Sequence, residues 1–478
     1  MYPPKVLPLC WIIAFIVMSF NALATDRYWV GQTPSGWNIS ANWSLTSGGA
    51  GGAGVPGASD MAIFDNAFNG NCIVDGAVNV LGIRIDGYAG TITQNGFAMA
   101  IGSYGYTQYS GTFLGGTADI TIGSTGLFVL TGGVFTSSAR SLILTGNRTL
   151  NQTLLAILGG VFNANNGTVV INPSHNCATR VYTLDVSPST LFYNMEIKGL
   201  YNCISSTIAT AAGDTVHVAN NFIHSDGILT GLFSVNGDLT VNADADGGTG
   251  VIILNGSGNQ TYMVASATGR TCQLVIDKPS GGVTPAVGTA DLYVQGLSLQ
   301  AGSFTAPAGT MNIGGDWNAN VVLFAHAGGV FNANNGTTII NPGHGCATRV
   351  YTLDVLPSTL FYNMEIKGLY NCVSSAITTA TDDTVHVVNN FIHSDGILNG
   401  QFSVKGNLTV NADADGGTGV ILLNSSGNQT YTVAPEAART CQIIVDKPSG
   451  SVMPAAGTTD LYIQGLSVLS GSFTAPTG

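Results

Sequence analysis

Charged side chains are scarce in this chain. Of 478 residues only 8% are Asp, Glu, Lys or Arg, against roughly 25% in typical soluble domains. Lys and Arg together number 14 and the net charge is −12, which excludes the basic surface that nucleic-acid binding needs. The same shortage leaves no polybasic segment that would be attracted to anionic lipid.

Glutamate is rarer still. It occurs three times, at Glu196, Glu365 and Glu436, whereas Gly occurs 64 times and Thr, Ser and Asn dominate the polar residues. Helices use Glu, Lys, Ala and Leu heavily, and strands favour Val, Ile and Thr. The composition therefore predicts an all-β protein whose surface is made of hydroxyls and amides.

Residues 1–24 have the pattern of a signal peptide. Lys5 precedes an apolar core from Leu7 to Phe20, and Ala22-Leu23-Ala24 forms a small-residue cleavage site. A membrane anchor is the alternative, but the apolar run is shorter than the roughly 20 residues that a span needs. We therefore expect a secreted or surface-exposed protein with no transmembrane segment in the mature chain.

An internal repeat dominates the rest of the sequence. Residues 157–325 are repeated in residues 326–478 at a constant offset of 169, as four pairs show: Val161/Val330, Cys177/Cys346, Cys203/Cys372 and Cys272/Cys441. Such self-similarity is typical of stacked architectures. The second copy stops 16 residues short of a full period, so we expect a fragment of a longer protein.

A finer period lies within each copy. Apolar runs lie 22, 18, 19 and 28 residues apart, with centres near Ile252, Leu274, Leu292, Met311 and Ile339. Apolar residues alternate with polar ones inside each run, as in strands with one buried face. This pattern predicts a parallel β-solenoid, with residues 104–156 as connecting coils. Tandem β-sandwich domains are the alternative, because Asn236-Gly237 lies between two apolar runs and could close a hairpin.

Residues 25–103 form a tryptophan-rich module that we expect to cap the stack. Trp29, Trp37 and Trp43 are suited to plug the open end of a solenoid. A sugar-stacking platform is the alternative role for these rings. Asn163, Asn165 and Asn166, repeated at Asn332, Asn334 and Asn335, are expected at corners with left-handed backbone.

The same module carries a family resemblance. Tyr28-Trp29-Val30-Gly31 is followed by Asn42-Trp43-Ser44, a Gly-rich stretch ending near Pro56, and the segment from Ser59 to Asp65. Over residues 28–103 this order resembles the start of many bacterial secreted adhesin-like and autotransporter-passenger-like β-solenoid proteins. The resemblance implies a surface-exposed solenoid and identifies no single activity.

Aspartates are the best metal candidates. Asp244 and Asp246 precede a Gly turn, and Asp413 and Asp415 repeat them. Alternating carboxylates before a Gly can donate oxygens to Ca²⁺, yet the third acidic position and the final Glu of a calcium loop are missing from this run. We therefore expect an Asp-stabilised turn and keep Ca²⁺ at these four residues as the alternative.

Two histidine motifs invite a chemical interpretation. His224-Ser225-Asp226, repeated at His393-Ser394-Asp395, does not predict a catalytic triad, because neighbours in a strand point to opposite faces. We expect a turn there. His175 with Cys177, and His344 with Cys346, could begin a zinc site, but no further ligands lie nearby in the sequence.

The cysteines leave two alternatives open. Cys177 and Cys203 lie 26 residues apart, as do Cys346 and Cys372, a separation close to one coil, so each pair could form a disulfide or remain reduced. Cys272 and Cys441 share the parity of buried residues and are expected to be free thiols.

These observations favour a non-enzymatic, adhesin-like rod that binds extracellular glycans or proteins by repeated weak contacts. A polysaccharide lyase or hydrolase is one alternative and a pure spacer is another. An enzyme of that class needs clustered carboxylates or an arginine base. Asp382-Asp383 is the one adjacent acidic pair, and Arg180 and Arg349 have no acidic residue in the sequence nearer than Asp185 and Asp354. We therefore predict no catalytic, cofactor-binding or metal residues.

Overall fold

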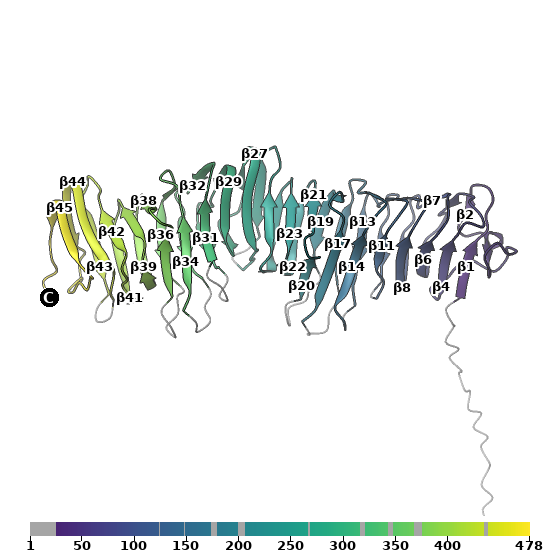
Figure 1. Cartoon of the computed structure of the whole chain (residues 1–478), viewed down its shortest axis with the longest axis horizontal. Helices are drawn as coiled ribbons and strands as arrows, with labels where there is room; N and C mark the ends of the chain where they lie inside the picture. The colour runs from purple at the N-terminus through teal and green to yellow at the C-terminus, as the bar shows by residue number, and fades with distance from the viewer. Residues whose placement is uncertain are drawn as a thin grey trace, which may run out of the picture.

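The protein is a β-solenoid of about 16 turns, with 56% of its residues in strands and 1% in helix. A computed structural model describes residues 25–123, 125–147, 149–173, 179–198, 206–265, 268–315, 321–342, 348–367, 375–434 and 438–478. The coils form one rod that runs from β1 (Thr25–Trp29) to β45 (Leu466–Phe473) (Figure 1). The solenoid predicted from the sequence is confirmed.

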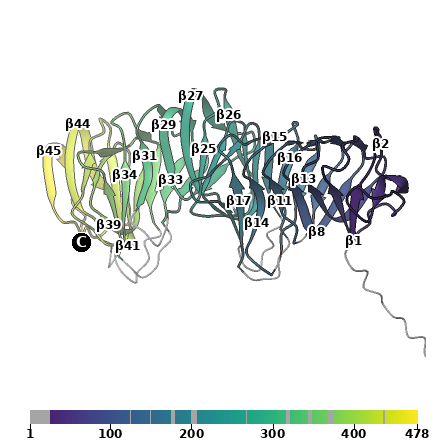
Figure 2. The ribbon, with the colours of Figure 1, turned by 45° about the vertical axis from the view of Figure 1, so that its right-hand side comes forward.

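Apart from one antiparallel pair at the start of the chain, the strands pair in parallel with strands of the adjacent coils, in a stack that both ribbon views show (Figure 2). Early coils contain three strands, and the first strand of each coil forms one continuous stack: β13 (Ser141–Leu144), β16 (Thr168–Ile171), β19 (Asn194–Ile197) and β22 (Phe222–Thr230). In this stack Leu142, Val169, Met195 and Phe222 occupy successive positions.

From β22 to β27 the coils contain two strands, and three-strand coils return in the second copy. β22 is long enough to pair with both β19 and β20 (Thr207–Thr210), so it covers two faces of the coil. β24 (Leu239–Gly247) and then β26 (Gln260–Val264) follow β22 in the stack. On the third face β23 (Leu232–Val235) pairs with β21 (Thr215–Val218) and is followed by β25 (Val251–Leu254) and β27 (Gln273–Pro285).

Asn236-Gly237 is a corner of a coil. It links β23 to β24, but β23 pairs with β25 in parallel and β24 pairs with β22 and β26. A hairpin would have paired β23 with β24 in antiparallel fashion. The sandwich alternative is therefore wrong for this segment, because the chain turns the corner and continues to the next face.

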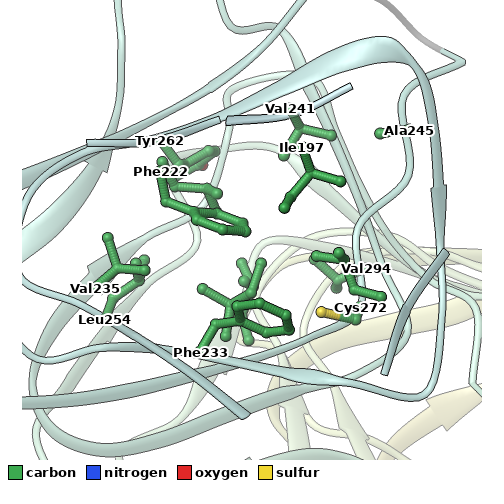
Figure 3. Close-up of a cluster of buried hydrophobic side chains, with 14 of the residues drawn as sticks. Ile197, Phe222, Phe233, Val235, Val241, Ala245, Leu254, Tyr262, Cys272 and Val294 are labelled. Atoms are coloured by element: carbon green, nitrogen blue, oxygen red, sulfur yellow. The ribbon is translucent and has the colours of Figure 1, made fainter. Parts of the chain in front are cut away.

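The core lies inside the coils and is continuous along the rod. Buried apolar residues from Trp29 to Val452 form one cluster. Ile252 and Leu274 are in register on adjacent coils and both are 0% exposed. Figure 3 shows the inward side chains of several coils, among them Phe222, Phe233 and Tyr262, filling the space between the strands. Each such side chain contributes about 1.5–3 kcal/mol by burial, which ties every coil to its neighbours.

The three tryptophans of the N-terminal module are buried plugs. Trp29, Trp37 and Trp43 are at most 1% exposed, and the Trp43 ring centroid lies 5.3 Å from that of Trp29, 4.9 Å from that of Trp37 and 5.6 Å from that of Phe64. Both Trp29 and Trp43 donate indole N–H bonds of 2.7 Å to backbone carbonyls. A sugar-stacking platform on these rings is excluded, since no ring face reaches solvent.

The entry of the chain reinforces this plug. β1 pairs in antiparallel fashion with β3 (Trp43–Ser44), which follows the 3-10 helix Ser40–Asn42, and in parallel with β4 (Asp60–Phe64). The antiparallel pair breaks the parallel pattern of the stack at its first coil.

Corner asparagines adopt the expected backbone. Asn165, Asn166, Asn334 and Asn335 have φ between 51° and 57°, a left-handed conformation that Asn tolerates better than most residues. The amide of Asn165 donates 2.9 Å to the Ser137 carbonyl one coil earlier. The expectation is wrong for the first Asn of each motif, which ends a strand: β15 (Val161–Asn163) and β32 (Val330–Asn332).

Two coil lengths differ from those that the apolar runs predicted. Ile252 pairs with Leu274 and Leu292 with Met311, as expected. Leu274, however, pairs with Leu297, because the 13-residue β27 bends round a corner and occupies two faces. Met311 pairs with Thr338, one residue before the predicted centre.

Candidate functional site

Three carboxylates from two adjacent coils meet on the outside of the rod. Asp226 of β22 is in register with Asp244 of β24, and Asp246 follows two residues later. Between them Ala245 is 2% exposed and points inward, whereas Asp244 and Asp246 are exposed. We call Asp226, Asp244 and Asp246 the first aspartate group.

The repeat produces a second aspartate group, which consists of Asp395, Asp413 and Asp415. Asp395 lies on β39 (Phe391–Leu398) in register with Asp413 on β41 (Leu408–Ala414). Sequence analysis identified the last two members of each group and missed the first. The available signal was the spacing, since Asp226 precedes Asp244 by 18 residues, one short coil.

The second aspartate group has perturbed proton affinity. The pKa of Asp395 is raised to about 6, and burial of its carboxyl is the largest cause. A hydrogen bond from the Gly396 backbone lowers this pKa, and the nearby carboxylates of Asp415 and Asp413 raise it. Its Oδ1 atom is buried and has no hydrogen-bond partner. Burial and Asp413 also raise the pKa of Asp415. Three carboxylates this close cannot all ionise as readily as isolated ones.

An arginine lies on the next coil beside each aspartate group. Asp246 is in register with Arg270, and Asp415 with Arg439. Both arginines are exposed, and among the described residues no ion pair joins either one to its neighbouring aspartate. The structure thus brings together acids and an arginine that are dispersed in the sequence.

Metal binding remains a prediction. Within the described ranges, no three or more His, Cys, Asp or Glu side chains are arranged to hold a metal ion. Ca²⁺ at Asp244, Asp246, Asp413 and Asp415 is therefore neither confirmed nor contradicted. His175, Cys177, His344 and Cys346, the residues considered for zinc, lie outside the described residues.

The His-Ser-Asp segments do not assemble a triad. His224 points into the core and is 0% exposed, with its Nε2 2.8 Å from the Gly227 carbonyl oxygen. Ser225 points outward and donates 3.2 Å to Glu196. The expected turn is wrong, because β22 runs through the segment and bends at Gly227, whose φ is 79°.

An outer polar ladder adjoins each aspartate group. In the first copy the Asn242 amide donates 2.8 Å to Ser225, which donates to Glu196 one coil earlier, and Lys198 lies 3.3 Å from that glutamate. The second copy repeats these contacts with the same residue types, at Asn411, Ser394, Glu365 and Lys367. The ladder therefore reproduces one chemical surface twice along the rod.

The adjacent acidic pair has a structural role. Asp383 accepts a 2.8 Å bond from the Val355 backbone N–H, and Asp214 accepts a 2.9 Å bond from Val186 in the first copy. Each carboxylate fastens a turn to the preceding coil. Asp382 occupies the position of Gly213, with φ of 67° against 88°.

The other candidates are placed only in part. Arg180 precedes β17 (Val181–Val186), and its guanidinium donates 3.2 Å to the Thr179 carbonyl. Arg349 precedes β34 (Val350–Asp354). The buried cysteines Cys72, Cys272 and Cys441 are free thiols, as expected for the last two. The predicted pairs Cys177–Cys203 and Cys346–Cys372 lie outside the described residues.

The fold and its lateral surface define this protein as a β-solenoid with a duplicated polar face. Among the described residues no helix is long and apolar enough to cross a bilayer. No protein-family description, curated protein or solved structure matches the chain.

Proposed function

We propose that this protein is a secreted or surface-exposed, non-enzymatic rod that adheres to other surfaces by repeated weak contacts. The observation that carries the proposal is the duplication of the outer polar ladder and the aspartate group on one rod. The continuous core fixes the spacing between the two copies. Because the copies are rigidly linked, the second contact forms at high effective concentration once the first is made.

Extracellular glycans are the favoured ligands. The exposed face of the coils is made of amides, hydroxyls and a few carboxylates, with only 14 Lys and Arg in the whole chain. These groups donate to and accept from sugar hydroxyls, and they repel polyanions through the net charge of −12. Extracellular proteins are the second class of partner for such a surface.

The test is a glycan array probed with residues 25–478, followed by adhesion to coated surfaces. Removing the ladder contacts in one copy (Ser225→Ala with Asn242→Ala) should lower the apparent affinity by at least tenfold, because it removes avidity rather than one of two independent sites. The same pair of changes in the second copy (Ser394→Ala with Asn411→Ala) is the matched comparison and should have a similar effect. If the protein binds no glycan and no matrix protein, adhesion is refuted and the alternative role as a spacer is favoured.

A polysaccharide hydrolase or lyase is the second candidate, because one observation favours it. The carboxyl of Asp395, with its pKa raised to about 6, lies beside Asp413, Asp415 and Arg439, and a carboxyl with a raised pKa is suited to act as a general acid. Release of reducing ends or unsaturated products from plant or algal polysaccharides would support this candidate. That release should then disappear in Asp395→Asn, whereas an inactive wild-type chain favours adhesion.

A further inference from the structure

A pocket of about 420 Å³ crosses several coils of the first copy. Its lining comes from Ile228 on β22, from Asp246 and the Gly248–Gly250 loop after β24, and from Gln273 at the start of β27. It continues through Gln295 and Gly296, which lie between β28 (Asp291–Val294) and β29 (Leu297–Thr305), to Val321 and Val322 of β31 (Val321–His326).

The pocket extends along the rod axis. Gln273 donates its backbone N–H to the Gly250 carbonyl one coil earlier, and Leu274 donates its backbone N–H to the Gly296 carbonyl one coil later. Leu297 is in turn in register with Phe324 of β31. Five successive coils therefore contribute, and at about 4.8 Å per coil the pocket extends roughly 19 Å.

Several glycines line this surface. Gly248 has φ of 124°, and an added Cβ would lie 2.2 Å from the Leu229 carbonyl oxygen, so the close approach of two coils requires glycine there. Gly250, Gly296 and Gly315 also line the pocket. Without side chains at these points, a ligand can approach the backbone closely.

The polar side chains of the pocket have unused hydrogen-bonding capacity. Gln273 and Gln295 are half-buried, and Asp246 and Thr249 are exposed. Within the described part of the chain, none of the four side chains makes a hydrogen bond or ion pair to another residue. Two carboxamides, a hydroxyl and a carboxylate thus face the pocket with free donors and acceptors.

This chemistry suits a neutral sugar chain. Carboxamides and a carboxylate bind sugar hydroxyls, and Ile228 and Val322 offer aliphatic surface to the C–H faces of the rings. An anionic ligand would meet the charge of Asp246 and the net charge of −12. The coil spacing is also close to the length of one pyranose residue in an extended chain, so one ring can lie over each coil.

We propose that this pocket binds a neutral, extended oligosaccharide parallel to the rod axis, with Gln273 and Gln295 as its hydrogen-bonding residues. The inference rests on the proposed adhesive function and names the site and the ligand class. The second copy repeats Asp415, Thr418, Gln442 and Gln464, but there the Gln442 amide already donates 3.4 Å to Ser467. Substitutions at these second-copy positions therefore serve as the matched controls.

The experiment titrates residues 25–478 with neutral hexasaccharides of β-1,4-glucan, β-1,4-mannan, β-1,4-xylan and β-1,3-glucan, and with hexagalacturonate as the anionic comparison. Binding is measured by calorimetry and by saturation-transfer NMR. At least one neutral hexasaccharide should bind, and hexagalacturonate should bind at least tenfold more weakly. Gln273→Leu and Gln295→Leu should each weaken binding at least tenfold, and Gln442→Leu should leave it within twofold.

A blocking variant keeps the test independent of folding defects. Thr249→Trp places an indole at the exposed rim of the pocket and should abolish binding, whereas Thr418→Trp in the second copy should not. If neutral hexasaccharides bind but the three changes in the first copy have the same effects as the two changes in the second, the proposed pocket is wrong and adhesion stands. Preferred binding of hexagalacturonate overturns the ligand class. If the array of the previous section also shows no binding, adhesion itself fails.

Discussion

Two buried histidines should make this solenoid sensitive to mild acid. His224 and His393 are 0% exposed, and each Nε2–H donates 2.8 Å to a backbone carbonyl, that of Gly227 or Gly396. A threonine hydroxyl approaches the other ring nitrogen, at 3.5 Å for Thr271 and His224. These partners satisfy the neutral ring. Burial is the main cause that lowers the pKa of both histidines from 6.5 to about 4.

The sign and size of the effect follow from proton linkage. A base whose pKa is lower in the folded state binds protons more readily when unfolded, so acid favours unfolding. The contribution of each neutral histidine to the free energy of unfolding is complete above pH 6.5 and is lost as the pH falls through 6.5 toward 4. With pKa values of 6.5 and about 4, the loss is about 3 kcal/mol at each histidine.

The perturbation is replacement of each histidine by glutamine, whose amide can still donate to the same carbonyl. Hydrogen exchange read at β22 and β39 is the suitable assay, because stacked coils open in segments. Between pH 7 and pH 4, the wild-type protection at β22 should fall about 100-fold more than in His224→Gln, which corresponds to about 3 kcal/mol. His393→Gln should have the same effect on β39.

The control is Ser225→Ala, which changes an outward side chain of the same strand without removing a titrating group. It should retain the acid sensitivity of the wild type. Equal loss of protection in the wild type and in His224→Gln would refute the reasoning, because the buried ring would then carry no protonation penalty.

Three further predictions concern stability. Lys278 is 2% exposed, and its ammonium donates 2.7 Å to the Gly256 carbonyl and 2.6 Å to Gln260 Oε1. Lys278→Met should cost about 1–3 kcal/mol by leaving the buried Gly256 carbonyl unpaired, and an unchanged guanidinium midpoint would contradict this. Trp43→Ala should cost about 3–5 kcal/mol and expose the N-terminal coils to proteolysis first, whereas uniform cleavage along the rod would argue against a plug. Gly213 has φ of 88°, so Gly213→Val should cost about 1–2 kcal/mol in thermal unfolding, and Gly213→Asp should cost less, because Asp382 already occupies the equivalent position. Equal costs for these two substitutions would refute the backbone argument.

Local features of the chain could be predicted because their causes are local. Apolar alternation around Ile252 and Leu274 records which side of a strand faces the core. Asn165 and Asn334 mark left-handed corners because their side chains tolerate that backbone. Trp43 could be predicted to lie in the core because its large apolar ring gains most from burial, and it is 0% exposed.

The pairing of distant residues was harder to predict because the coils differ in length. Phe222 pairs with a residue 17 positions later, whereas Gln152 pairs with one 30 positions later. A strand that bends round a corner, as β27 does, changes the number of residues in the coil without changing the alternation of apolar and polar residues. The spacing of 18 residues between Asp226 and Asp244 therefore did not by itself identify them as neighbours, although they lie side by side in the rod.

The sequence by itself determined the strand content, the stacked architecture and the duplicated surface. Side-chain alternation and a repeat of constant offset can be recognised without knowing which residues of adjacent coils are in register. Only the tertiary structure decided which outward side chains lie next to one another. It placed Asp395 against Asp413 and Asp415, raising its pKa, and it aligned Gln273 and Gln295 along one pocket. These neighbours are set by the register between coils, and that register results from core packing and corner geometry accumulated over the whole turn.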